Sequence, residues 1–296
     1  MRMMAFGPDW PNGSTRMLGI VGDPLAHSLS PGLHTAVLRR LDRNLIYLPF
    51  TVSEERLETF LRDAPGLGVI GCNVTTPYKE AVARLVQAED EETERTRTVN
   101  TVVFSEGRAL GSGTDGAGVL GFLRGAGLDS EPFGILGFGA AARSLAYRAI
   151  RSGAPLVSVW TRRPEEVRTQ ITSWGGIDVR VEGEMELAPE PPRDRQEPGV
   201  VSSPALWIST IPPGGSSPPE RFWRRASPGV LLDLNYGSGR DARVLEARGH
   251  SWRAAGGLGP LCYQAALSLG RWLGEEVPAA LFFEALGRPE RTLRPE

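Results

Sequence analysis

The sequence predicts an α/β protein of two domains, and three observations carry this prediction. The chain has 296 residues, which at about 150 residues per domain is enough for two. Short β-branched runs alternate with segments of helical periodicity, the pattern of βα units around a mainly parallel sheet. A glycine-rich turn in the second half lies directly between a predicted strand and a predicted helix, as in nucleotide-binding α/β domains.

In the first half, apolar runs predict the strands and the periodic segments between them predict the helices. Strands are expected at 17–21, 45–50, 69–74 and 101–104, with helices starting at Pro31, Glu54 and Pro77. The segment 115–126 repeats apolar residues at helical spacing, so it should be a helix that leaves this half. We place the junction between the domains there.

The second half continues the alternation of strands and helices. Strands are expected at 133–136, 156–160, 205–211 and 230–234, followed by one helix from Leu261 and a last helix over 279–286. The stretch 187–204 is rich in proline and charged residues, which predicts a long surface loop.

Composition and charge exclude several classes of function. With 33 basic and 35 acidic residues the net charge is −2, so a non-specific nucleic-acid binder is not expected. No apolar run approaches the roughly 18 residues of a membrane span, and we expect a cytoplasmic protein. Cys72, Cys262 and three scattered histidines form neither a disulfide framework nor a metal site.

Lys79 is unusual, because all but one of the 33 basic residues are arginine. The lysine follows a predicted strand end in 73–79, with Pro77 suited to a first helical position and a threonine suited to the cap. A cation in the first turn opposes the helix dipole, which destabilises the ammonium form. Lys79 is therefore a candidate proton donor, although an arginine-biased codon usage would also leave a lone lysine.

Gly137, Gly139 and Ala142 form G-x-G-x-x-A, the turn in which a pyrophosphate approaches the backbone at a helix N-terminus. The next predicted strand is followed by Arg162 and Arg163, where an acidic residue would bind an unphosphorylated ribose. Two guanidinium groups suit a 2′-phosphate, so the sequence predicts NADP rather than NAD. A ligand-free turn and solvated arginines are the alternatives.

The segment 22–31 joins the first predicted strand to the helix that Pro31 would start. The hydroxyls of Ser28 and Ser30 lie close to that helix start and could bind a small carboxylate together. A capped helix without ligand is the alternative reading of the same pattern.

These motifs together resemble the shikimate dehydrogenase family over nearly the whole chain. The segment 22–31 resembles G-D-P-x-x-H-S-x-S-P, and 73–79 matches N-V-T-x-P-x-K. Further similarities, listed in chain order, are V-N-T at 99–101, T-D-G at 114–116, the nucleotide loop at 137–143, D-x-x-Y at Asp233 and Tyr236, and G-L-x-x-L-x-x-Q at 257–264.

The resemblance implies an NADP-dependent oxidoreductase that reduces 3-dehydroshikimate to shikimate, in chorismate and aromatic amino-acid biosynthesis. Lys79 and Asp115 would be the catalytic pair. The implied substrate-binding residues are Ser28, Ser30, Thr75, Asn100, Asp115, Tyr236 and Gln264. The implied cofactor-binding residues are Gly137, Gly139, Ala140, Ala142, Thr161, Arg162, Arg163, Thr210 and Gly257.

The resemblance also implies the domain plan and leaves some alternatives open. Residues 1–116, completed by the C-terminal helices at 258–296, would bind substrate, and 117–257 would be a Rossmann-like NADP domain. Gly113 and Pro260 depart from the family pattern. A dehydrogenase of quinate or an amino analogue is one alternative, and a weakly catalytic or non-catalytic ligand-binding paralogue, which the departures on the nucleotide side support, is the other. The expected partner is a small molecule, not nucleic acid or a membrane, and a homodimer is a further expectation.

Overall fold

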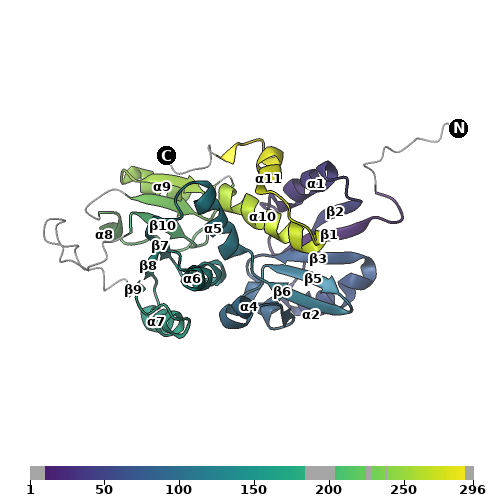
Figure 1. Ribbon diagram of the computed structural model, residues 1–296, viewed down its shortest axis with the longest axis horizontal. Helices are drawn as coiled ribbons and strands as arrows, with labels where there is room; N and C mark the ends of the chain where they lie inside the picture. The colour runs from purple at the N-terminus through teal and green to yellow at the C-terminus, as the bar shows by residue number, and fades with distance from the viewer. Residues whose placement is uncertain (1–10, 184–203, 225–228, 238, 291–296) are drawn as a thin grey trace. The chain divides into compact units, whose positions relative to one another are not determined.

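The computed structural model describes residues 11–183, 204–224, 229–237 and 239–290 (Figure 1). The chain divides into two compact units. Unit 1 comprises the residues up to Thr114 together with Ala265–Arg288, and unit 2 comprises Asp115–Gln264 together with the residues from Pro289 onward. The loop predicted at 187–204 lies, apart from its last residue, outside the described residues.

Unit 1 is built on a six-stranded sheet of order β2-β1-β3-β5-β6-β4. Its strands are β1 (Arg16–Gly22), β2 (Leu45–Thr51), β3 (Val69–Val74), β4 (Gln87–Ala88), β5 (Thr101–Ser105) and β6 (Arg108–Ser112). The strands β2, β1 and β3 are parallel, as the sequence predicts, whereas β5 runs antiparallel to both of its neighbours. Parallel pairing therefore holds for only part of this sheet.

One of the two antiparallel pairs, β5 with β6, follows from a tight hairpin that the sequence analysis did not predict. Glu106 and Gly107 connect β5 to β6 with φ of 49° and 72°, the positive values that a two-residue hairpin turn requires. The β6 sequence Arg-Ala-Leu-Gly-Ser contains no β-branched residue, so it gave no strand signal.

The helices of unit 1 are short, and most follow a strand. They are α1 (Ser30–Arg40), η1 (Glu54–Arg56), α2 (Leu57–Asp63), η2 (Ala64–Leu67), α3 (Lys79–Ala83), α4 (Glu91–Thr96) and α11 (Ala279–Leu286). Helices α1 and α11 pack against each other within this unit (Figure 1). The helix α10 (Leu258–Leu273) begins in unit 2, and its second half belongs to unit 1.

Unit 2 contains a second six-stranded sheet, and all of its strands are parallel. Its strands are β7 (Phe133–Leu136), β8 (Leu156–Trp160), β9 (Arg180–Glu182), β10 (Leu206–Ser209), β11 (Val230–Asp233) and β12 (Arg253–Gly256). Its other helices are α5 (Asp115–Gly125), α6 (Ala140–Ser152), α7 (Pro164–Ser173), α8 (Glu220–Trp223) and α9 (Ala242–Gly249).

The strand order of unit 2 is β12-β11-β10-β7-β8-β9, so the chain reverses its direction of progress across the sheet between β7 and β10. Ligands of open α/β sheets bind at the carboxyl ends of the strands beside such a reversal. Both faces of the sheet are covered: on β10, Ile208 packs into one apolar core and Trp207 into the other. The fold thus directs attention to the loops after β7 and β10.

A buried histidine makes the stability of unit 1 sensitive to acid. His34 of α1 is stacked on Tyr47 at 4.3 Å and meets Phe282 edge-on at 5.0 Å. Neither ring nitrogen has a hydrogen-bond partner among the described residues, and burial lowers the pKa of His34 to about 3. The contribution of the neutral ring to the stability of the folded state is therefore complete when the pH is above the unfolded pKa, near 6.5. This contribution is lost as the pH falls towards 3.

We expect His34→Phe to weaken this acid sensitivity. At about pH 5 the histidine should cost the wild type about 2 kcal/mol relative to about pH 7.5, a cost that phenylalanine lacks. The measurement is amide exchange in β1 and β3, compared between variant and wild type at each pH. A packing defect caused by the larger ring would change the stability by the same amount at both pH values. An unchanged pH dependence of the stability would contradict the prediction.

Candidate functional site

Several predicted site residues of unit 1 lie at one edge of its sheet. The carboxyl ends of the parallel strands β1 and β3 lead to Ser28 and to Thr75, and β5 starts at the same edge because it runs antiparallel. A Cβ added to Gly22, the last residue of β1, would lie 2.5 Å from Thr75 Cγ2. The two loops therefore approach closely, and the structure brings these segments together.

Backbone hydrogen bonds connect two further predicted site residues, Asn100 and Lys79, to this edge. Val74 N donates to Asn100 O at 2.8 Å, and Val99 N donates to Lys79 O at 3.0 Å. The start of α3 is thus fixed to the segment that carries Asn100.

The start of the lysine helix differs from the prediction. The helix α3 begins at Lys79, not at Pro77, and no side chain caps it. Tyr78 N donates to Thr75 O at 2.9 Å, which closes a turn and delays the helix by two residues. With only five residues, α3 has a smaller dipole than a regular helix would have. The half-buried Lys79 is consequently placed more by the turn than by the helix.

The two serines lie at the N-terminus of α1. Ser30 N donates to Ser28 Oγ at 3.3 Å, and the N-cap residue Leu29 makes no side-chain cap bond. The Ser28 hydroxyl thus bonds a backbone N–H at the start of this eleven-residue helix, as in the capped helix that is the alternative to a ligand site. Backbone N–H groups at such a helix start favour a bound anion.

In unit 2, Asp115 and Gln264 are carried by neighbouring helices. Asp115 opens α5, and the next residue donates its backbone N–H to Ser144 Oγ of α6 at 3.0 Å. A Cβ at Gly118, one turn further, would lie 2.7 Å from Gln264 Cβ, so α5 and α10 approach closely there. Lys79 belongs to unit 1, and its pairing with Asp115 stays a prediction.

The glycine turn has the expected geometry. Gly137 follows β7 with φ of 85°, a left-handed conformation that favours glycine, and a Cβ there would meet Thr210 Oγ1 at 3.1 Å. Gly139 is the N-cap of α6, and a Cβ on it would meet nothing within 4 Å. Ala142, in the first turn of α6, is fully buried. The first turn of α6 thus presents its N-terminus beside open space, as phosphate binding requires.

The arginines after β8 differ in their surroundings. The exposed side chain of Arg163 forms an ion pair with Glu166 at 3.0 Å, and its backbone N–H donates to Thr161 Oγ1 at 3.2 Å. Thr161 is buried, so it shapes this turn, whereas Arg162 is exposed. A phosphate bound by Arg163 would compete with Glu166.

For two of the predicted cofactor-binding residues, Thr210 and Gly257, the structure shows a role in the fold that does not depend on a cofactor. Thr210 Oγ1 donates to Leu136 O at 3.0 Å, which braces the strand that leads into the glycine turn. A Cβ at Gly257 would overlap with the backbone oxygen of Leu234, so only glycine fits against that backbone. Tyr236 is half-buried in the segment after β11.

The carboxyl group of Asp233 lies buried at the end of β11. The sequence analysis named this residue only as part of the D-x-x-Y motif. Asp233 is fully buried, and burial raises its pKa to about 6, against the opposing effects of Ser209, Arg243 and Asn235. Asn235 donates to Asp233 Oδ1 at 2.9 Å and to Ile211 O at 2.7 Å. Asp233 therefore helps to hold the segments after β10 and β11 together.

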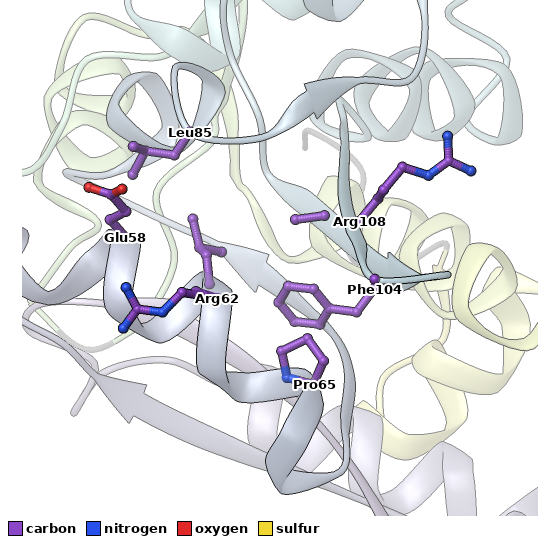
Figure 2. A pocket seen from close by; sticks show the side chains of 9 residues that line it. Glu58, Arg62, Pro65, Leu85, Phe104 and Arg108 are labelled. Atoms are coloured by element: carbon purple, nitrogen blue, oxygen red, sulfur yellow. The ribbon is translucent and has the colours of Figure 1, made fainter.

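A cavity of about 290 Å³ lies elsewhere in unit 1, between α2 and the β5–β6 hairpin (Figure 2). It is lined by Glu58, Leu61, Arg62, Pro65, Leu85, Phe104, Gly107, Arg108 and Ala109. Its two arginines pair with neighbouring acids, Asp63 and Glu106, and none of the predicted site residues lines it. Within the described ranges, no group of three metal-ligating side chains and no helix able to span a membrane was found.

Comparison with known proteins identifies similarity to shikimate dehydrogenases. The family model of the shikimate dehydrogenase substrate binding domain matches residues 20–102. The shikimate dehydrogenase (NADP(+)) of Methanopyrus kandleri is 33% identical over 286 residues, covering 93% of this chain and 96% of the relative. That of Hyphomonas neptunium is 34% identical over 272 residues, covering 88% and 92%.

Solved structures support the same fold. The shikimate 5-dehydrogenase of Thermus thermophilus, crystallised with NADP(H) and shikimate, has a TM-score of 0.74 at 27% identity. The similarity covers 94% of this chain and 100% of that one. The predicted α/β fold with a Rossmann-like unit is thereby confirmed.

Proposed function

The chain belongs to the shikimate dehydrogenase family, and we propose that it catalyses the NADPH-dependent reduction of 3-dehydroshikimate to shikimate. The observation that carries this proposal is similarity over 93% of the chain to a curated NADP-dependent enzyme of that activity. The motif resemblance in the sequence is thus confirmed at the level of the family. The reaction belongs to chorismate and aromatic amino-acid biosynthesis.

The residues of unit 2 fit NADP. The N-terminus of α6 and the open space at Gly139 suit a pyrophosphate, and Arg162 with Arg163 suits a 2′-phosphate. When bound, the reduced cofactor supplies a hydride. The remaining chemistry falls to the protein, which must bind the substrate, exclude water and provide a proton.

Lys79 provides that proton in the mechanism we propose. The substrate carbonyl oxygen gains negative charge as the hydride reaches its carbon, so a nearby ammonium group stabilises the charge and then protonates the oxygen. Asp115 orients the ammonium group. Ser28 and Ser30 hold the substrate carboxylate, with Tyr236 near it, and the ring hydroxyls contact the substrate-binding residues Thr75, Asn100, Asp115 and Gln264.

We expect Ser28→Ala to raise the KM for shikimate with little change in kcat. A hydrogen bond to a charged group contributes roughly 1.5–3 kcal/mol, so the increase should be about 10- to 100-fold. The matched control is Ser105→Ala, which removes an exposed hydroxyl from the end of β5 in the same unit. An unchanged KM in the Ser28 variant would remove this serine from the carboxylate site.

The function itself is tested by turnover of shikimate with NADP, compared with quinate and with NAD. A preference for shikimate and NADP supports the proposal. A preference for quinate or an amino analogue would identify that compound as the substrate instead. Tight binding of shikimate without turnover would identify a non-catalytic paralogue, for which the departures at Gly113 and Pro260 would be the first positions to revert. The cytoplasmic location and the homodimer stay predictions.

A further inference from the structure

Asn235 connects three segments at the carboxyl edge of the sheet of unit 2. It lies just after β11, and its side-chain nitrogen donates to the carbonyl oxygen of Ile211, after β10, at 2.7 Å. The same nitrogen donates to Asp233 Oδ1, at the end of β11, at 2.9 Å. The backbone oxygen of Asn235 accepts from Gly257 N, after β12, at 2.9 Å. One residue thus joins the segments that follow three neighbouring strands.

The two donations fix the orientation of the Asn235 amide. A backbone carbonyl oxygen only accepts hydrogen bonds, so the amide atom that faces Ile211 must be the nitrogen. An amide nitrogen carries two hydrogens, and Asp233 Oδ1 is the second acceptor. Both hydrogens are therefore used inside the fold, and the amide cannot turn over without breaking both bonds.

The carbonyl group of Ile211 depends on a side-chain donor because the ladders of β10 end beside it. Among the described residues, the last ladder bonds of this strand run from Thr210 N to β7 and from Leu234 N to β10, both at 2.9 Å. The chain then leaves the sheet at Pro212, which has no N–H group and restricts the residue before it to extended conformations. Ile211 is buried, and an unpaired carbonyl there would be costly. Asn235 supplies the missing donor and so fixes the point at which the loop departs.

The loop after β10 lies directly against the glycine turn after β7. A Cβ added to Gly137 would lie 3.0 Å from Ile211 Cγ1 and 3.1 Å from Thr210 Oγ1. The strands β7 and β10 are neighbours at the reversal of the strand order, and a dinucleotide binds across the sheet at such a reversal, with one half on each side. The loop that Asn235 holds is therefore part of the floor of the cofactor site.

The two sides of the reversal take different halves of the cofactor. Arg162 and Arg163, which suit the 2′-phosphate, follow β8, so the adenosine half belongs to the side of β7, β8 and β9. The nicotinamide half then belongs to the side of β10, β11 and β12, whose following segments Asn235 connects.

We propose that Asn235, oriented by Asp233, is a positioning residue for the nicotinamide half of NADP, because it holds the carbonyl group of Ile211 and with it the loop after β10. Asn235 acts through this loop and need not touch the cofactor. It occupies a position that the D-x-x-Y motif leaves open. The inference rests on the proposed function, in which NADP is the cofactor.

The first test measures, by calorimetry, the Kd of Asn235→Leu for NADP and for adenosine 2′,5′-bisphosphate, which lacks the nicotinamide half. Leucine has a similar size but no donor. We expect the Kd for NADP to rise about 5- to 20-fold, whereas the Kd for the adenosine ligand should stay within about twofold. Asn235→Ala should give the same pattern. Equal changes for both ligands, or no change for either, would overturn the inference.

The second test concerns the orienting role of Asp233. Asp233→Asn keeps an oxygen that accepts from Asn235, so its Kd for NADP should stay within about twofold of wild type. Asp233→Ala removes this acceptor and should raise the Kd about 5- to 20-fold. Combining Asp233→Ala with Asn235→Leu should weaken binding no further than Asn235→Leu alone, because both residues act through one bond. A normal Kd in Asp233→Ala, or additive effects in the double variant, would overturn the inference.

The matched control separates the position of the loop from the stability of unit 2. Val244 of α9 is buried in the same apolar cluster as Ile211, and its side chain makes no hydrogen bond. Val244→Ala should lower the melting temperature and leave the Kd for NADP within about twofold of wild type. If it weakens NADP as much as Asn235→Leu does at an equal loss of melting temperature, Asn235 is a merely structural residue and the inference is overturned.

Failure of the proposed function would look different. A wild-type protein that melts cooperatively but binds neither NADP nor adenosine 2′,5′-bisphosphate in calorimetry would refute the proposed function, and the inference with it. Normal wild-type binding combined with an unchanged Kd in Asn235→Leu would overturn the inference alone.

Discussion

Replacing Lys79 with alanine should lower kcat by a factor of about 10²–10⁴, the usual contribution of a positioned acid, while the Kd for shikimate changes only a few-fold. The difference follows from when the charge forms: the carbonyl oxygen becomes strongly basic only as the hydride arrives. Removing the ammonium group therefore removes an interaction of the transition state rather than of the bound substrate. Steady-state kinetics and calorimetric binding measure the two quantities separately.

Lys79→Arg separates the two tasks of this side chain. Arginine keeps the positive charge but does not release its proton in proteins, so it should recover substrate binding and only a small part of kcat. A wild-type rate in either variant would remove Lys79 from the mechanism.

The composition of the chain allows an independent check without mutation. Lys79 is the only lysine, so acetylation of side-chain amines modifies this one residue. We expect acetylation of Lys79 to inactivate the enzyme. Bound shikimate should slow this acetylation. Acetylated protein that keeps its activity would contradict the proposed role.

The sequence predicted four of the six strands of unit 2, β7, β8, β10 and β11, because they are buried on both faces, and it missed the short edge strands β9 and β12. The bounds of β7 and β8 are those expected, since their residues form short, nearly continuous apolar runs between turn signals. The helix α4 was missed because its sequence, Glu-Glu-Thr-Glu-Arg-Thr, has no apolar periodicity. Its start is set instead by Asp90, which accepts from Thr93 N at 2.8 Å, and this cap was the available signal.

Motifs predicted the site residues better than they predicted the contacts between them. Thr101 and Thr114 stand inside the V-N-T and T-D-G motifs, yet the hydrogen bonds of their hydroxyls with Asn100 were not expected. No local signal marks Ser268 of α10, which lies within hydrogen-bond distance of both hydroxyls, because a serine in a helix is polar whether it faces solvent or a buried network. Gly257 shows the converse: its place in a motif suggested cofactor binding, whereas the nearby backbone of Leu234 already requires glycine.

The second large effect is expected at the cofactor arginines. The double variant Arg162→Ser and Arg163→Ser should lower kcat/KM for NADPH by about 10²–10⁴, because each charge-assisted hydrogen bond to the 2′-phosphate contributes roughly 1.5–3 kcal/mol. Its kcat/KM with NADH should stay within a few-fold of wild type, since that cofactor lacks the phosphate. The matched control is Arg224→Ser, an exposed arginine of unit 2 paired with Glu220 at 3.0 Å.

Glu166 makes this prediction sharper, because it already pairs with Arg163 at 3.0 Å. A bound 2′-phosphate must share that guanidinium group, so Glu166→Gln should tighten NADP binding several-fold and leave NAD binding unchanged. Adenosine 2′,5′-bisphosphate and adenosine 5′-phosphate, used as competing ligands, isolate the phosphate from the nicotinamide half. If the Arg162 and Arg163 variant weakens both adenosine ligands equally, the arginines are surface charges and the phosphate is held elsewhere.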